Sequence, residues 1–82
     1  MLSKVITIEM NEFQLYAKVG HKIREIRLQK SISQQELSDI CGFEKSNMSR
    51  IETGKTNLTL KTLLTISIAL AEPIKNFLDF DE

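Results

Sequence analysis

Two short helical segments, each followed by a glycine, constrain the fold of this 82-residue chain more than any other feature. The first opens with Ser33-Gln34-Gln35-Glu36, where the serine hydroxyl can accept from the glutamate amide and the glutamate can reach back. Gly42 suits the left-handed position after a helix, and a second short helix then runs from about residue 44 to Gly54. Two helices joined by such a tight turn outline a helix-turn-helix, here at about residues 33–53.

The remainder of the chain after its first ten residues also favours helices. Asn11 can cap a helix that runs to about Lys30. Thr59 can begin a fourth helix, which is apolar nearly all round and is therefore expected in the centre of the domain. Pro73 suits the first turn of a fifth helix. We therefore predict an all-α, compact five-helix domain over residues 11–82.

Residues 1–10 form a separate extended segment in this prediction. Val5 to Met10 is rich in β-branched residues and alternates apolar with polar residues from Ile6 onward, as a half-buried strand does. The sequence offers no partner strand, so three interpretations stay open. The segment is a tail, packs on the domain, or pairs with the same strand of a second subunit.

Composition excludes several classes of protein. A single cysteine cannot close an intrachain disulfide, and no apolar stretch approaches the roughly 20 residues that span a bilayer. With no signal-peptide pattern, we expect a cytoplasmic protein without a membrane partner. The net charge is zero, but the segment from Lys18 to Lys61 has an excess of cations and the two ends are acidic. This asymmetry is compatible with a polyanionic partner.

The second helix of the motif has an outer face suited to nucleic acid. At about 100° per residue, Met48 and Ile51 point inward, and the opposite side carries cations and hydroxyls without a carboxylate. Such groups donate hydrogen bonds to phosphates and to the acceptor edges of bases. A simply solvated face is the alternative. The outward residues are Lys45, Ser46, Ser49, Arg50 and Thr53, with Asn47 on the shoulder.

Four motifs stand in order along the chain: Val19-Gly20-x-x-Ile23-Arg24-x-x-Arg27, Ser33-Gln34-x-x-Leu37, Ser49-Arg50-Ile51-Glu52-x-Gly54-Lys55 and Thr62-Leu63-x-x-Ile66. Together they resemble the Cro/C1-type helix-turn-helix family of phage repressors and related regulators. The resemblance covers about Val19 to Leu78 and implies a five-helix, lambda-repressor-like fold, binding of double-stranded DNA, and a homodimer on an inverted repeat. It implies a transcriptional regulator, most simply a repressor.

The resemblance also implies roles for individual residues. Gln34 matches a glutamine that touches a phosphate or supports the recognition helix. Lys45 and Ser46 match base-reading positions, and Ser49 and Arg50 match positions that reach bases or flanking phosphates. Lys55 and Asn57 match the loop that lies along the DNA backbone. Asn47 can donate to a base or a phosphate, or can cap its own helix turn. Arg27 and Glu52 match positions that form an ion pair between the first helix and the recognition helix. The expected DNA-binding residues are Gln34, Lys45, Ser46, Asn47, Ser49, Arg50, Lys55 and Asn57.

Three positions and the zero net charge depart from the family pattern. Leu58 stands where proline is frequent, which leaves the loop before the fourth helix less rigid. Glu44 stands where a serine or threonine N-cap is usual, although its carboxylate still suits the positive end of a helix. Cys41 replaces a small apolar residue, and its thiol is either buried and inert or a redox sensor.

The C-terminal segment suggests a surface for self-association. We expect its apolar residues to pair two copies of the chain, and Glu36, Asp39 or the acidic tail are available to contact RNA polymerase. The alternative function is a protein-interaction module, an antitoxin or adaptor that uses the same fold. The expected dimer interface consists of Ile74, Phe77, Leu78 and Phe80.

Catalysis has little support in the sequence. His21 is the only histidine, and no cluster has the spacing of a metal site, a phosphate-binding loop or a nucleophile motif. We therefore expect no enzyme, no metal and no cofactor.

Overall fold

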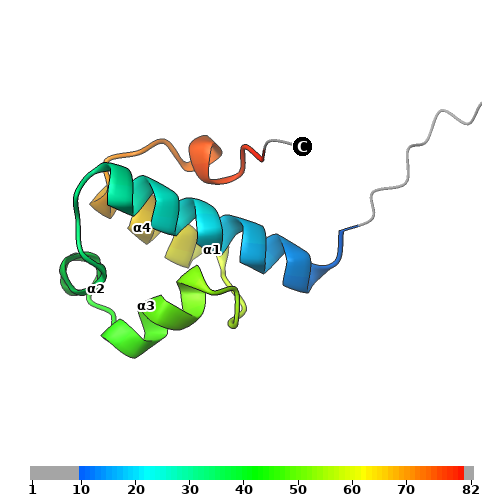
Figure 1. The fold of residues 1–82 in the computed structure, drawn as a ribbon, viewed down its shortest axis with the longest axis horizontal. Coiled ribbons are helices and arrows are strands. Elements are labelled where there is room, and N and C mark those ends of the chain that lie inside the picture. The colour runs from blue at the N-terminus through cyan, green and yellow to red at the C-terminus, as the bar shows by residue number, and fades with distance from the viewer. Residues whose placement is uncertain (1–9, 81–82) are drawn as a thin grey trace, which may run out of the picture.

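The computed structural model describes residues 10–80, which form four α-helices and one 3-10 turn (Figure 1). Within this range there is no strand, and no helix is long and apolar enough to cross a membrane. The expected extended segment falls almost entirely on residues 1–9, outside the described residues. The elements are α1 (Glu12–Gln29), α2 (Gln34–Cys41), α3 (Lys45–Glu52), α4 (Leu60–Ala69) and the turn η1 (Ile74–Phe77).

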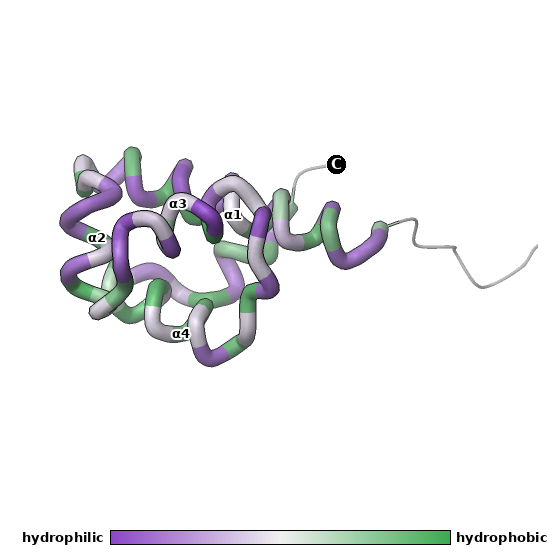
Figure 2. Tube along the Cα trace, turned by 90° about the horizontal axis from the view of Figure 1, so that it is seen from below, coloured by the Kyte–Doolittle hydropathy of each residue, from purple (hydrophilic) through white to green (hydrophobic). Residues whose placement is uncertain are grey.

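The helices enclose one core. α1 packs against α3 and η1, and α2 packs against both α3 and α4 (Figures 1 and 2). Each of the five elements contributes at least one side chain with no exposed surface, so the core depends on all of them. These residues include Ile23, Leu37, Met48, Ile66 and Phe77.

The prediction of a fifth helix is wrong, because only the 3-10 turn η1 forms at that place. Pro73 precedes η1 as predicted, but no side chain caps the turn. Four residues provide too few hydrogen bonds to sustain an α-helix, and short 3-10 pieces are the usual outcome. The fold therefore has four α-helices instead of five.

Phe77 is also misplaced in the predicted dimer interface. Its ring is 0% exposed and belongs to the chain's own core, so it has no surface to offer a partner. Ile74 and Phe80 are half-buried against that core, and only Leu78 is largely exposed. The apolar character of this segment thus reflects mainly the packing of η1 against α1 and α4.

α4 does not lie in the centre of the domain, contrary to the prediction. One side of α4 is buried, including Leu63 and Ile66. The other side exposes Leu60, Leu64 and Ile68 to 75%, 49% and 71%. Because these three residues are four apart, they form a continuous apolar stripe, which we call the α4 stripe.

α1 and α3 approach each other closely at Gly20. A Cβ atom built on Gly20 would lie 2.3 Å from the Ile51 carbonyl oxygen and 2.8 Å from that of Glu52. No side chain larger than hydrogen fits there without a movement of the α3 backbone. The glycine therefore fixes the distance between the long helix and the second helix of the motif.

Candidate nucleic-acid interface

The boundaries of α2 set where α3 begins. Ser33 accepts from the Glu36 amide at 3.0 Å, and the Ser33 amide donates to the Glu36 carboxylate at 2.8 Å. The bond from the Ser33 amide to the carboxylate is the largest cause that lowers the pKa of Glu36 below its ordinary value, and the Ser33 hydroxyl is a second cause. At the other end Gly42 adopts a left-handed conformation, φ 73°, and the Phe43 amide donates to the Ser38 carbonyl at 2.8 Å. The chain reverses there and delivers α3 across α2.

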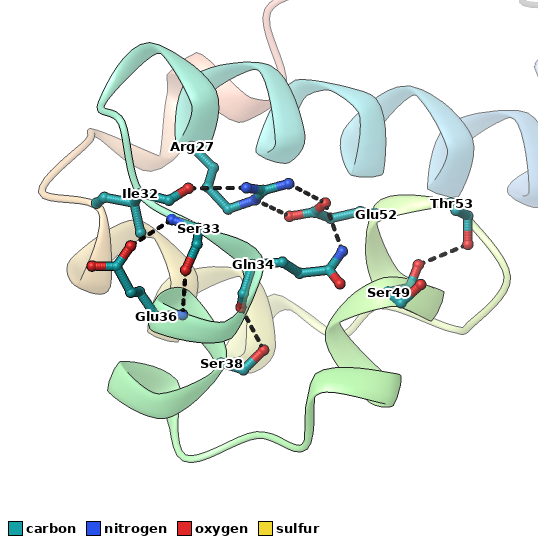
Figure 3. A network of polar contacts seen from close by, with 9 residues as sticks. All are labelled: Arg27, Ile32, Ser33, Gln34, Glu36, Ser38, Ser49, Glu52 and Thr53. Atoms are coloured by element: carbon teal, nitrogen blue, oxygen red, sulfur yellow. Dashed lines mark hydrogen bonds and ion pairs between the residues drawn. The ribbon is translucent and has the colours of Figure 1, made fainter.

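A buried ion pair holds α3 against α1. Arg27 and Glu52 are only 6% and 5% exposed, and two nitrogens of the guanidinium donate to the two carboxylate oxygens at 2.7 and 3.0 Å (Figure 3). The third guanidinium nitrogen donates to the Ile32 carbonyl at 2.9 Å. Gln34 donates from its amide to Glu52 at 3.1 Å. The pair therefore connects α1, the start of α2 and the end of α3.

This network has a structural consequence for the helix that carries it. Arginine presents a planar fork that matches a carboxylate in two places, which fixes orientation as well as distance. Among the described residues, no buried side-chain nitrogen or oxygen lacks a partner. Two roles are expected for Gln34, a contact to a phosphate and support of the recognition helix. Its hydrogen bond to Glu52 is a contact of the second kind.

The outward face of α3 is polar and cationic. Met48 and Ile51 point into the core, as the helical spacing predicts. Ser49 is half-buried, and the Thr53 hydroxyl donates to the Ser49 carbonyl at 2.8 Å, back into its own helix. The remaining side chains of this face are exposed to solvent. They are Lys45, Ser46, Asn47 and Arg50.

Glu44 precedes this face without capping it. Its backbone has N-cap geometry, but its carboxylate makes no capping hydrogen bond. The Glu44 side chain therefore caps none of the backbone amides in the first turn of α3.

The loop after α3 is pressed against α1. Gly54 is left-handed, φ 72°, and a Cβ atom there would lie 2.6 Å from the Ala17 Cα. The Tyr16 hydroxyl donates to the Asn57 side-chain carbonyl at 3.0 Å. Lys55 and Asn57 are both exposed on this loop, at the edge of α3. The two loop residues predicted to contact a DNA backbone thus lie next to α3.

Tyr16 was missed by the sequence analysis. It is 41 residues from Asn57 in the chain, and no local pattern marks a half-buried tyrosine as the partner of a distant asparagine. The only available signal was that it is the single tyrosine of the sequence.

Cys41 is half-buried at the end of α2. Burial raises the pKa of its thiol above the ordinary value, which disfavours the thiolate that oxidants attack. Over residues 10–80, no group of three acidic, histidine or cysteine side chains is arranged to hold a metal ion.

Comparison with known proteins agrees with this geometry. Residues 23–76 match the helix-turn-helix family model HTH_3. The chain is 42% identical over 62 residues to the control protein C.BamHI of Bacillus amyloliquefaciens, which covers 74% of this chain and 76% of that protein.

Two solved structures are similar in sequence as well as in fold. The restriction-modification controller protein C.Esp1396I is 33% identical with a TM-score of 0.72, covering 78% of this chain and 83% of its own. The restriction-modification controller protein C.AhdI of Aeromonas hydrophila is 29% identical with a TM-score of 0.73, covering 76% and 94%.

The matched residues include the whole motif, the Arg27–Glu52 pair and the exposed face of α3. The chain therefore belongs to the Cro/C1-type helix-turn-helix family and is a DNA-binding transcriptional regulator.

Proposed function

We propose that this regulator reads its operator by placing α3 in the major groove. Lys45 and Arg50 have the length and charge to reach the O6 and N7 acceptors of guanine, and Asn47 can bond adenine or a phosphate. The observation that carries the proposal is an outward face with two cations and no carboxylate. The Arg27–Glu52 pair fixes the orientation of α3, and therefore the direction in which these side chains project.

Residues next to the outward face of α3 make the contacts to the DNA backbone in this proposal. Lys55 and Asn57 extend from the loop after α3 and are exposed, which suits donation to phosphates. Ser46 and Ser49 donate at the margin of the groove. Gln34 acts through Glu52 and supports α3.

The relatives suggest which genes are regulated. Two of the similar structures are restriction-modification controller proteins, and a third relative is a control protein. We therefore propose that this chain represses restriction-modification genes by occupying an inverted repeat at their promoter. One recognition helix per half-site, half-sites about 34 Å apart, would match a two-fold dimer.

The experiment is a selection of genomic fragments with purified protein, followed by a salt titration on the best fragment and on random duplex. Enrichment of an inverted repeat is expected, with binding strongly weakened by Arg50→Ala. Lys75→Ala is the matched control, because Lys75 is an exposed cation on η1, across α1 from α3 (Figure 1). Equally weak binding to every fragment at low salt would overturn the proposal.

We propose that two copies pair through the α4 stripe. Leu60, Leu64 and Ile68 form a larger exposed apolar surface than the one left at Leu78 in the segment first expected to dimerise. Three uncharged side chains in one line can meet the same stripe of a second copy without charge repulsion, as a two-fold contact requires. α4 packs against α2 and η1 and is a separate helix from α3 (Figure 2), so pairing through the α4 stripe uses none of the outward side chains of α3.

Sedimentation equilibrium tests this interface. Ile68→Glu should shift the protein to monomer and weaken operator binding, because an unpaired charge would be buried at the contact. Ile40→Glu is the control, since Ile40 is an equally solvent-facing apolar residue, 60% exposed, on α2. A dimer that survives Ile68→Glu would place the interface elsewhere.

A further inference from the structure

We propose that Tyr16 is a positioning residue for DNA binding, which acts by orienting the Asn57 amide on the loop after α3. The inference rests on the proposed function, because it assumes that this loop lies along the DNA backbone. It adds to the binding surface a residue of α1, outside the helix-turn-helix itself.

The geometry shows a defined hydrogen bond between distant parts of the chain. The half-buried Tyr16 donates through its hydroxyl to the Asn57 side-chain oxygen at 3.0 Å. Asparagine has one acceptor oxygen and one donor nitrogen in its amide. With its oxygen bound to Tyr16, the amide is held in one orientation and keeps its N–H donors for another acceptor. A phosphate accepts hydrogen bonds and cannot donate them, so this is the orientation that a DNA backbone requires.

Packing next to the Tyr16–Asn57 hydrogen bond fixes the position of the rest of the loop. The Gly54 backbone rests on Ala17, the residue after Tyr16, with no room for a side chain between them. The Lys55 amide donates to the Arg50 carbonyl at 2.8 Å, which ties the loop to the end of α3. The loop is thus fixed at its start by α3 and α1, and further along by the tyrosine hydroxyl. Asn57 reaches DNA already oriented, and less conformational freedom is lost on binding.

The nature of the bond predicts a particular change in binding. A neutral amide releases no counterion when it contacts a phosphate, whereas a lysine does. Loss of the Tyr16 hydroxyl should therefore weaken binding without changing its salt dependence. Lys55→Ala should weaken binding and also reduce the salt slope by about one.

A double-mutant cycle with Tyr16→Phe and Asn57→Ala tests the proposal. The probe is a mixed-sequence 30-base-pair duplex at low salt, because phosphate contacts do not depend on sequence. Tyr16→Phe should weaken binding about 3–10-fold, the scale of one net hydrogen bond. In the Asn57→Ala background the same substitution should have almost no effect, since the hydroxyl has lost the group that it orients. The side-chain amide resonances of Asn57 should also shift in Tyr16→Phe.

Controls separate this role from the alternatives. Thr65→Val removes a hydroxyl that bonds the Lys61 carbonyl within α4, and should leave DNA affinity unchanged. If Tyr16→Phe weakens binding equally with and without Asn57, the hydroxyl contacts DNA directly or acts through stability, and the positioning role is wrong. If the wild-type protein binds the duplex and Tyr16→Phe binds it equally well, only this inference fails. A wild-type protein that binds no duplex overturns the proposed function as well.

Discussion

Arg27 places a charge where charges are costly to bury, and the structure compensates it fully. Its three donor nitrogens all have acceptors, two on Glu52 and one on the Ile32 carbonyl. Such a pair contributes little net stability against an apolar replacement of both partners, but removing one partner leaves the other charge buried and alone. The value of the pair lies in the fixed direction of α3.

Arg27→Met should therefore destabilise the fold by about 3–5 kcal/mol, because Glu52 would remain buried without its cation. Urea unfolding measures the loss, and fragment selection measures base preference. Lys22→Met is the control, since its 3.4 Å contact with Glu25 is a surface pair worth less than about 1 kcal/mol. An unchanged melting temperature with an altered operator preference would contradict this interpretation.

Ala71, unlike Arg27, is a residue whose backbone conformation is unfavourable for its type. It follows α4 with φ 51°, in the left-handed region where a Cβ atom is strained. Ala71→Gly should stabilise the protein by about 0.5–1 kcal/mol, after the greater freedom of glycine in the unfolded chain is subtracted. Ala69→Gly, two residues earlier at the last position of α4, should instead destabilise the protein by up to about 1 kcal/mol. Thermal melting of both variants distinguishes the two effects.

At the scale of elements, local signals predicted the helix boundaries well. Asn11, Ser33 and Thr59 cap the helices as expected, because a cap depends on the few residues beside it. The exposed side of α4 was not predictable, since a helix apolar nearly all round does not indicate which side its neighbours cover. The fifth helix failed for a related reason, because its apolar residues are equally compatible with a turn that buries Phe77.

The contact between α1 and α3 allows a direct test. Gly20→Ala should destabilise the domain by about 1–3 kcal/mol and displace α3, because the new methyl would lie 2.3 Å from the Ile51 carbonyl oxygen. DNA affinity should fall further than stability alone explains.

Gly42→Ala is the comparison for that test. A Cβ atom at Gly42 meets nothing within 4 Å, so only the cost of its left-handed backbone remains. Equal losses of DNA affinity in folded Gly20→Ala and Gly42→Ala would argue against a specific role for the α1–α3 distance.

At the scale of the whole molecule, the chain has no net charge but distributes its charges unevenly. The cations of α3 and its loop face outward, whereas Glu52 is neutralised inside. The sequence predicted this face from helical spacing alone. It did not predict the bond between Tyr16 and Asn57, because contacts across the fold depend on how helices pack.

Two carboxylates link stability to pH. Hydrogen bonds from Asn76 and Lys30 lower the pKa of Glu72, as those from Ser33 lower that of Glu36. A carboxylate with a lowered pKa stabilises the fold above its ordinary pKa of 4.5, and this contribution is lost as the pH falls through the folded-state pKa. The melting temperature should therefore decline below about pH 4.5. Glu36→Gln with Glu72→Gln should make that decline shallower, and an unchanged profile would count against both bonds.

The division between the buried and exposed sides of α3 has a consequence for how such regulators diversify. Met48, Ile51 and Glu52 hold the helix in place, whereas Lys45, Ser46 and Asn47 face solvent. Mutations at the outer positions can thus accumulate without a folding defect to select against them. Because the proposed function assigns operator reading to these positions, two descendants of a duplicated gene can drift to separate promoters while they share one interior. Cross-talk between them would then be lost first through these few codons.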